Sequence, residues 1–99
     1  ALQDPPDAIL STSDFGALGA INWLKSKGYK IPQDISVVGF SNEPFTQFME
    51  MPISSIDQKP IEMGKSAAQL FLKQSKEKNQ EIENIVLEPE FIQRASSTL

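Results

Sequence analysis

Small polar residues follow two apolar stretches of this sequence, and their types suit the binding of a ligand. The segment STSD at 11–14 comes directly after AIL, and the segment SNE at 41–43 comes directly after ISVVGF. Hydroxyl and amide groups donate and accept hydrogen bonds, and ionised carboxylates accept them. The chemistry that these positions favour is therefore recognition of a polar molecule.

The composition removes most catalytic and metal-binding chemistry. The 99 residues include no Cys and no His, which excludes thiolate nucleophiles, imidazole bases and the usual zinc ligands. The serines have no nucleophile-elbow signature around them. Gly16 and Gly19 lack the third glycine and the spacing of a dinucleotide fingerprint. We therefore expect no enzyme activity, no metal site and no cofactor.

Charge and hydropathy narrow the class of protein further. Nine Lys and Arg residues against 13 Asp and Glu residues give a net charge of -4, which does not suit a surface that neutralises phosphates. No apolar run approaches the roughly 20 residues of a membrane span, and no leader opens the chain. Absence of Cys is typical of a reducing compartment. We expect a cytoplasmic chain of at most one domain that contacts no membrane.

A strand, a helix and a second strand would position the polar segments. Residues 8–10 predict a short buried strand, and residues 35–40 are a β-branched run typical of a strand buried on both faces of a parallel sheet. Between them Ala17, Ile21 and Leu24 recur on one helical face. In such a βαβ unit both polar segments emerge at the edge where open α/β sheets bind ligands. The alternative is that they are ordinary helix caps.

The second half of the sequence predicts shorter elements around one long helix. Residues 43–52 predict a single helical turn rich in Phe and Met, and residues 53–57 predict a short strand. Pro60 opens an amphipathic helix that ends near Lys76. Residues 76–84 predict a solvated loop, and residues 85–96 predict two short strands interrupted at Pro89. The fold class is α/β.

Three motifs together carry a resemblance to a known family. They are DFGALGA after the first strand, IPQDISVVGF at the second, and SSIDQ before the long helix. With the terminus FIQRASS they resemble the effector-binding core of the lactose-repressor (LacI/GalR) family of bacterial transcription regulators, over essentially the whole chain. The resemblance implies a parallel-sheet βαβ fragment of a three-layer, periplasmic-binding-protein-like (type I) fold.

The same resemblance implies that the chain contributes to two subdomains. Residues 1–56 and 89–99 would belong to the C-terminal subdomain, and residues 57–88 would give the N-terminal one a helix and a strand. The helix-turn-helix that reads operator DNA would lie outside this chain. The apolar face of the long helix would then lack its sheet, so we expect the isolated piece to recruit a second copy or to exchange this helix between copies.

Family ligand contacts carry over to five positions here: Ser13, Asp14, Ser41, Asn42 and Gln58. The family commonly has Asp where this chain has Ser41, so an acceptor becomes a neutral donor and acceptor. The effector is then a sugar-like molecule, another polar metabolite or an anion. Ser13 and Asp14 also suit helix caps, and Asn42 suits a turn. Arg94 fits a structural pairing better than an effector contact.

The resemblance also implies a homodimer. The positions where family members meet their partner are Leu18, Asn22, Phe45, Phe48, Met49 and Met51. The implied function is the effector-binding and dimerisation portion of a LacI-type regulator, in which the effector changes affinity for the operator. The alternative is a fragment of a periplasmic solute-binding protein of the same fold, which would deliver a sugar to a transporter.

Overall fold

Strands and helices alternate along the chain, as an α/β fold requires. The computed structural model describes residues 4–76 and 82–98. Its elements, in chain order, are β1 (Ala8–Leu10), α1 (Asp14–Ser26), β2 (Ser36–Val38), the 3-10 helix η1 (Pro44–Gln47), β3 (Ser55–Asp57), α2 (Pro60–Lys76), β4 (Glu90–Ile92) and the 3-10 helix η2 (Ala95–Ser97).

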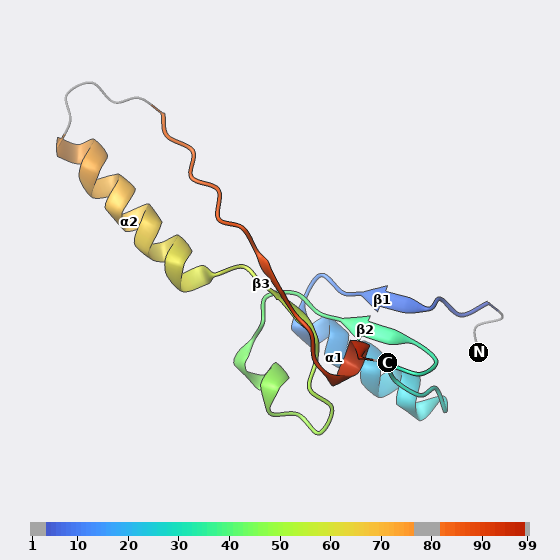
Figure 1. Cartoon of the computed structure of the whole chain (residues 1–99). Coiled ribbons are helices and arrows are strands. Elements are labelled where there is room, and N and C mark those ends of the chain that lie inside the picture. Colours follow the sequence, from blue (N-terminus) through green and yellow to red (C-terminus); the bar gives the residue numbers. More distant parts are fainter. Residues whose placement is uncertain (1–3, 77–81, 99) are drawn as a thin grey trace.

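The chain forms a body and an arm (Figure 1). The body holds β1, α1, β2, η1 and η2, and the arm consists of α2 and the extended segment 82–89. Strands β3 and β4 lie between them. The radius of gyration is 18.6 Å and the extents are 62 × 27 × 20 Å, whereas a compact domain of this length has a radius of gyration of about 13 Å. The projecting arm accounts for the elongation.

The body is built on the predicted βαβ unit. β1 and β2 pair in parallel with Ile9 opposite Val37, and α1 packs on this pair. Side chains from α1, β2 and the segments beside them close the core, because their apolar positions recur at helical or strand spacing. The buried core residues are Ala17, Ile21, Leu24, Ile31, Ile35, Val37 and Ile53.

The two strands of the βαβ unit are less buried than the sequence predicts. Ala8 is exposed and Leu10 is 70% exposed, so the prediction of a buried β1 is wrong. Val37 is fully buried, but its neighbours Ser36 and Val38 are only partly buried. The physical reason is that this sheet has two strands, and α1 covers the face to which Ile9 and Val37 contribute.

The second sheet is an antiparallel pair that the sequence did not predict. β3 and β4 pair with Ser55 opposite Ile92 and Asp57 opposite Glu90. An isolated parallel bridge joins Val38, the last residue of β2, to Ser54, which directly precedes β3. The end of β2 and the start of β3 therefore lie side by side. The first of the two strands predicted in 85–96, which precedes Pro89, does not form in the structure. A strand needs a neighbour for its N–H and C=O groups, and the arm offers this segment only a helix.

Helix α2 has the predicted bounds, with Pro60 in its first turn, and none of its residues is buried. Ile61 is 75% exposed and Phe71 is 69% exposed, as expected for an apolar face without its sheet. The recruitment of a second copy stays a prediction.

Residues 77–81 of the predicted loop lie outside the described residues. In the part of the chain that the structure describes, no helix is long and apolar enough to cross a membrane.

Gly39, directly after β2, leaves room for the fully buried side chain of Asp14. A Cβ on Gly39 would overlap Asp14 Oδ1 and would lie 3.2 Å from its Cα. We expect Gly39→Ala to lower the free energy of unfolding of the intact protein by about 1–3 kcal/mol, measured by urea denaturation. Gly19→Ala is the control, because nothing lies within 4 Å of its Cβ position and alanine favours a helix. Equal stability of the two variants would contradict this packing.

Candidate ligand-binding site

A buried carboxylate at the start of α1 ties three segments together. Asp14 Oδ2 accepts a hydrogen bond from the backbone N–H of Glu43 at 2.6 Å, and Oδ1 accepts one from the Ser55 hydroxyl at 2.7 Å. The preceding Ser13 caps α1, since its Oγ accepts from the N–H of Gly16 at 3.0 Å. Both oxygens of Asp14 and the hydroxyl of Ser13 therefore serve bonds within the protein.

The loop after β2 has an unusual backbone. Ser41 has a φ of 107° and Asn42 a φ of 53°, and Lys59 before α2 has a φ of 54°. Within residues 4–76 and 82–98 these are the non-glycine residues with positive φ. Backbone bonds hold the loop on β3, because the N–H of Ser41 donates to the Ile56 carbonyl at 2.9 Å. Strain of this kind persists only where surrounding contacts fix it, and it gathers at functional sites.

Arg94 fixes the same loop from the other side. Its Nη2 donates to Asn42 Oδ1 at 2.7 Å, and its Nη1 donates to Thr46 Oγ1 at 2.9 Å and to the Ile53 carbonyl at 2.8 Å. Asn42 in turn donates through Nδ2 to Asp57 Oδ2 at 3.3 Å. Arg94 thus pairs within the protein, as the sequence predicts, and Asn42 uses both ends of its amide on protein partners.

Two buried serines support this network, and sequence reasoning missed both. The N–H of Ser54 donates to Ser96 Oγ at 2.8 Å, and the Ser96 hydroxyl donates to the Val37 carbonyl at 2.6 Å. Ser54 Oγ accepts from the N–H of Arg94 at 2.7 Å. The available signal was a serine pair in both ISSID and RASS, which is unusual beside buried apolar residues. The serines join the chain leaving β4 to the start of β3.

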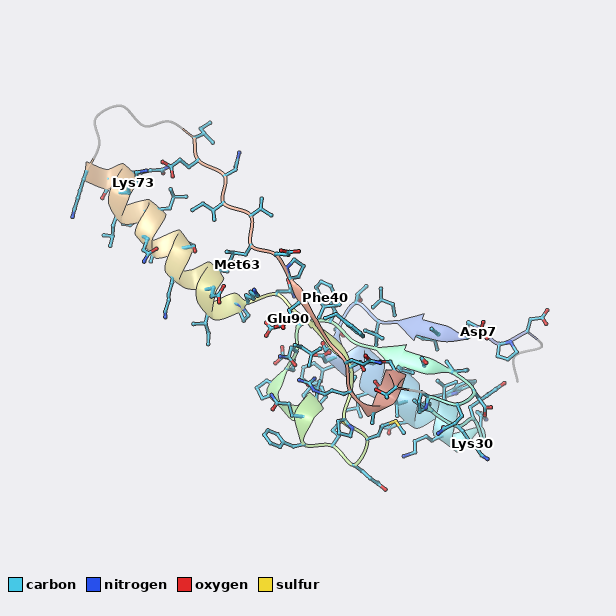
Figure 2. The ribbon with its side chains drawn as sticks, in the orientation of Figure 1. Asp7, Lys30, Phe40, Met63, Lys73 and Glu90 are labelled. Atoms are coloured by element: carbon cyan, nitrogen blue, oxygen red, sulfur yellow. The ribbon has the colours of Figure 1, made fainter. Side chains whose placement is uncertain are left out.

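A pocket lies where the body meets the arm. Its volume is about 230 Å³, and its lining residues are Ser41, Glu43, Gln58, Pro60 and Met63. Inside it Gln58 Nε2 donates to Ser41 Oγ at 3.1 Å. Figure 2 shows Met63 near the start of α2, at the junction with the body. The structure therefore brings Ser41 and Gln58 together in one pocket, while Ser13, Asp14 and Asn42 hold the segments around it.

A larger hollow of about 470 Å³ lies between α2 and the segment 83–87. Apolar side chains such as Met63, Leu70 and Val86 contribute most of its lining, and it contains none of the five predicted ligand contacts. On α2 its wall is formed by Met63, Ala67 and Leu70, whereas the exposed Ile61 and Phe71 do not line it. We therefore place the candidate site in the smaller pocket, where polar groups from several segments converge.

The six predicted dimer positions fall into two groups. Leu18, Phe45, Met49 and Met51 are partly buried and pack against the core, whereas Asn22 is exposed and Phe48 is 81% exposed. Phe15, which the prediction did not include, is 66% exposed, and its ring lies 4.9 Å from that of Phe45 between centroids. Phe15 of α1 and Phe45 of η1 thus contact each other on a partly exposed surface.

Comparison with known proteins decides the family. The chain matches the periplasmic binding protein-like domain over residues 1–97. The chain belongs to this family. It is 35% identical over 96 residues to the HTH-type transcriptional repressor PurR of Mannheimia succiniciproducens, which covers 97% of this chain and 29% of that protein. It is 42% identical over 73 residues to the HTH-type transcriptional repressor CytR of Escherichia coli, which covers 74% of this chain and 21% of that protein.

Solved structures of periplasmic-binding-protein-like regulators agree with this assignment. A putative LacI transcriptional regulator from Bacillus cereus subsp. cytotoxis superposes with a TM-score of 0.87 at 28% identity, over 96% of this chain and 34% of that one. The transcriptional regulator CelR in complex with cellobiose gives 0.83 at 30% identity, over 91% and 28%. The predicted fold class and the LacI resemblance are confirmed. The chain is a portion of the effector-binding core of LacI-family regulators. It spans under a third of the length of the curated relatives that it matches above.

The bonds of Arg94 make a direct prediction for stability. Arg94→Lys should lower the free energy of unfolding of the intact protein by roughly 1–3 kcal/mol, because an ammonium group cannot reach three separate acceptors from one stem. The midpoint of urea denaturation measures the effect. Lys27→Arg, the reverse exchange at an exposed position of the described chain, is the control and should leave the midpoint unchanged. A midpoint of Arg94→Lys equal to wild type would rule out this role.

Proposed function

We propose that the chain is the effector-binding and dimerisation portion of a LacI-type transcription regulator, and that its effector binds in the pocket lined by Ser41 and Gln58. The observation that carries the proposal is the composition of this pocket. The loop after β2, the end of β3 and the start of α2 each contribute to its lining. In parallel α/β sheets ligands bind beyond the carboxyl ends of the strands, where this pocket lies.

The backbone supports the same assignment. Ser41, Asn42 and Lys59 have positive φ, and Ser41 itself lines the pocket. Bonds from Asp14 and Arg94 hold the loop in this conformation, so the hydroxyl of Ser41 is in place before a ligand arrives. In this proposal Ser41 and Gln58 contact the effector. Ser13, Asp14 and Asn42 position the segments that carry them.

The position of the pocket gives a mechanism for regulation. Residues 1–56 and 89–99 would form the C-terminal subdomain, and residues 57–88 would belong to the N-terminal one. An effector that contacts both the loop after β2 and the start of α2 would favour one pose of the subdomains over the other. If the DNA-binding domain prefers one of these poses, the effector changes the operator affinity. The size of this change is set by the difference between the effector's binding free energies for the two poses.

The class of effector follows from the pocket and from a relative. A hydroxyl and an amide recognise polar molecules, and the CelR relative was solved as a complex with cellobiose. We therefore propose a carbohydrate-like or other polar metabolite. The curated relatives are named as transcriptional repressors, so we propose regulation rather than catalysis, in the cytoplasm where operator DNA lies. The same names favour a regulator over a periplasmic solute-binding protein.

Dimerisation completes the proposal. The surface that includes Leu18, Asn22, Phe45 and Phe48 would meet its copy across a two-fold axis. Exposed aromatic side chains support this surface, because large apolar groups in contact with water commonly mark protein interfaces. A two-fold dimer matches the two half-sites of a palindromic operator.

Substitutions in the pocket test the effector site. In the intact regulator, a thermal-shift screen of sugars and nucleobases identifies a compound that raises the melting temperature. Gln58→Ala and Ser41→Ala should each weaken its binding by about five- to tenfold, because each loses a hydrogen bond worth roughly 1 kcal/mol. Calorimetric titration measures the Kd. Gln33→Ala, at an exposed position away from the pocket, should bind normally. Normal binding by both pocket variants would place the effector elsewhere.

A charge on the aromatic surface tests the dimer. Phe48→Glu in the intact regulator should weaken self-association by at least about tenfold, because a charge would be buried at an apolar contact. Sedimentation velocity at several concentrations gives the dimer dissociation constant. Gln33→Glu adds the same charge at an exposed position outside this surface and should dimerise like wild type. An unchanged dissociation constant for Phe48→Glu would exclude this surface as the interface.

A further inference from the structure

One carboxylate in the pocket has no partner in the described part of the chain. Glu43 lines the pocket with Ser41 and Gln58, yet within residues 4–76 and 82–98 no hydrogen bond or ion pair reaches its side-chain oxygens. We propose that Glu43 determines the charge of the effector: it selects compounds that donate hydrogen bonds and carry no negative charge. This inference rests on the proposed function, because it concerns the same pocket.

The chemistry of Glu43 favours ligands with hydrogen-bond donors and disfavours anions. An ionised carboxylate only accepts hydrogen bonds, so it binds hydroxyl, amide or ammonium donors. Bonds to such a charged acceptor are stronger than bonds between neutral groups. A phosphate or carboxylate on the ligand would meet a like charge in a partly buried pocket, where repulsion is less screened than in water.

The other polar side chains of the pocket, Ser41 and Gln58, do not select the charge of a ligand. Ser41 Oγ accepts from Gln58 Nε2 at 3.1 Å, so the Ser41 hydroxyl proton remains available to a ligand. Gln58 keeps its carbonyl oxygen and a second amide proton. Both side chains can therefore donate and accept, and neither brings a charge. They fit neutral and charged ligands alike.

Neighbouring charges add to the field of Glu43. A second hollow of about 350 Å³ adjoins the pocket at Pro60, and one cation, Lys59, lines it with three acids, Asp57, Glu62 and Glu90. The guanidinium of Arg94 is a second nearby cation; it bonds to the neutral acceptors of Asn42, Thr46 and Ile53 and keeps its charge, but it does not line either hollow. The residues that line the two hollows include four acids and one cation, and this excess of negative charge disfavours the anionic effector that the sequence left open.

The backbone of Glu43 is fixed on both sides. Its N–H donates to the buried Asp14 carboxylate at 2.6 Å, and its carbonyl accepts from the backbone N–H of Thr46 at 3.0 Å and from the Thr46 hydroxyl at 2.7 Å. Pro44 follows at the start of η1. The loop therefore holds the backbone of Glu43 beside the pocket when a ligand arrives, and only the side chain has to adjust.

The test uses the intact regulator and probes matched in shape but not in charge. Glucose, galactose, ribose and adenosine are compared with glucosamine and galactosamine, and with glucuronate, galacturonate, ribose 5-phosphate and adenosine monophosphate. A neutral or amino compound should raise the melting temperature most. In Glu43→Gln the Kd of that compound should rise about tenfold or more, and its preference over the anionic counterpart should fall by a similar factor.

Controls separate the inference from the proposed function. Glu50→Gln makes the same charge change at an exposed residue outside the pocket and should bind as wild type does. Tightest binding of an anionic probe by wild type overturns the inference. So does a Glu43→Gln variant with unchanged affinity and preference while Ser41→Ala and Gln58→Ala weaken binding. If no probe raises the melting temperature, the pocket takes no donor-rich ligand, and the proposed effector class and the role of Glu43 both fail.

Discussion

The buried carboxylate of Asp14 is the constraint on which the rest of the site depends. It lies at the start of α1, where the helix dipole favours a negative charge, and accepts bonds from Glu43 and Ser55. A buried charge without such partners would cost far more than the bonds contribute. Separating the loop after β2 or the start of β3 from α1 would therefore leave the buried carboxylate without its partners, at a large cost in free energy. Gly39 has no side chain, and a Cβ at this position would overlap Asp14 and prevent the approach.

Local patterns in the sequence predict the elements but not the contacts between distant segments. Helical spacing predicts α1 and α2, and the order of strand and helix places the two polar segments at one edge of a parallel sheet. The burial of β1 was overestimated, because among the described residues no element covers the side of the sheet that Leu10 faces. The pairing of β3 with β4 and the bond of Arg94 to Asn42 join residues far apart in the chain. No local periodicity encodes such pairs. Glu43 belongs to the polar segment at 41–43, but it follows the family ligand positions and is therefore not among the five predicted contacts.

Hydrogen bonds, more than apolar packing, define the junction between body and arm. The apolar core lies under β1 and β2, whereas Ser54, Ser96 and Arg94 hold the strands that lead away from it. Hydrogen bonds are directional, so a buried network of them specifies one arrangement more narrowly than packed methyl groups do. A pocket at such a junction keeps its polar groups at fixed distances although little apolar surface is buried around it.

The paired strands at the junction also have a mechanical consequence. β3 and β4 form a two-stranded ribbon, bonded in register from Ser55 opposite Ile92 to Asp57 opposite Glu90. Sliding one strand along the other would break the ladder of bonds, whereas bending the ribbon across its flat face breaks none. Such a connection gives the arm a preferred axis of rotation. A small bend of the ribbon near the pocket would therefore tilt α2, and the displacement of its far end would grow with the length of the helix.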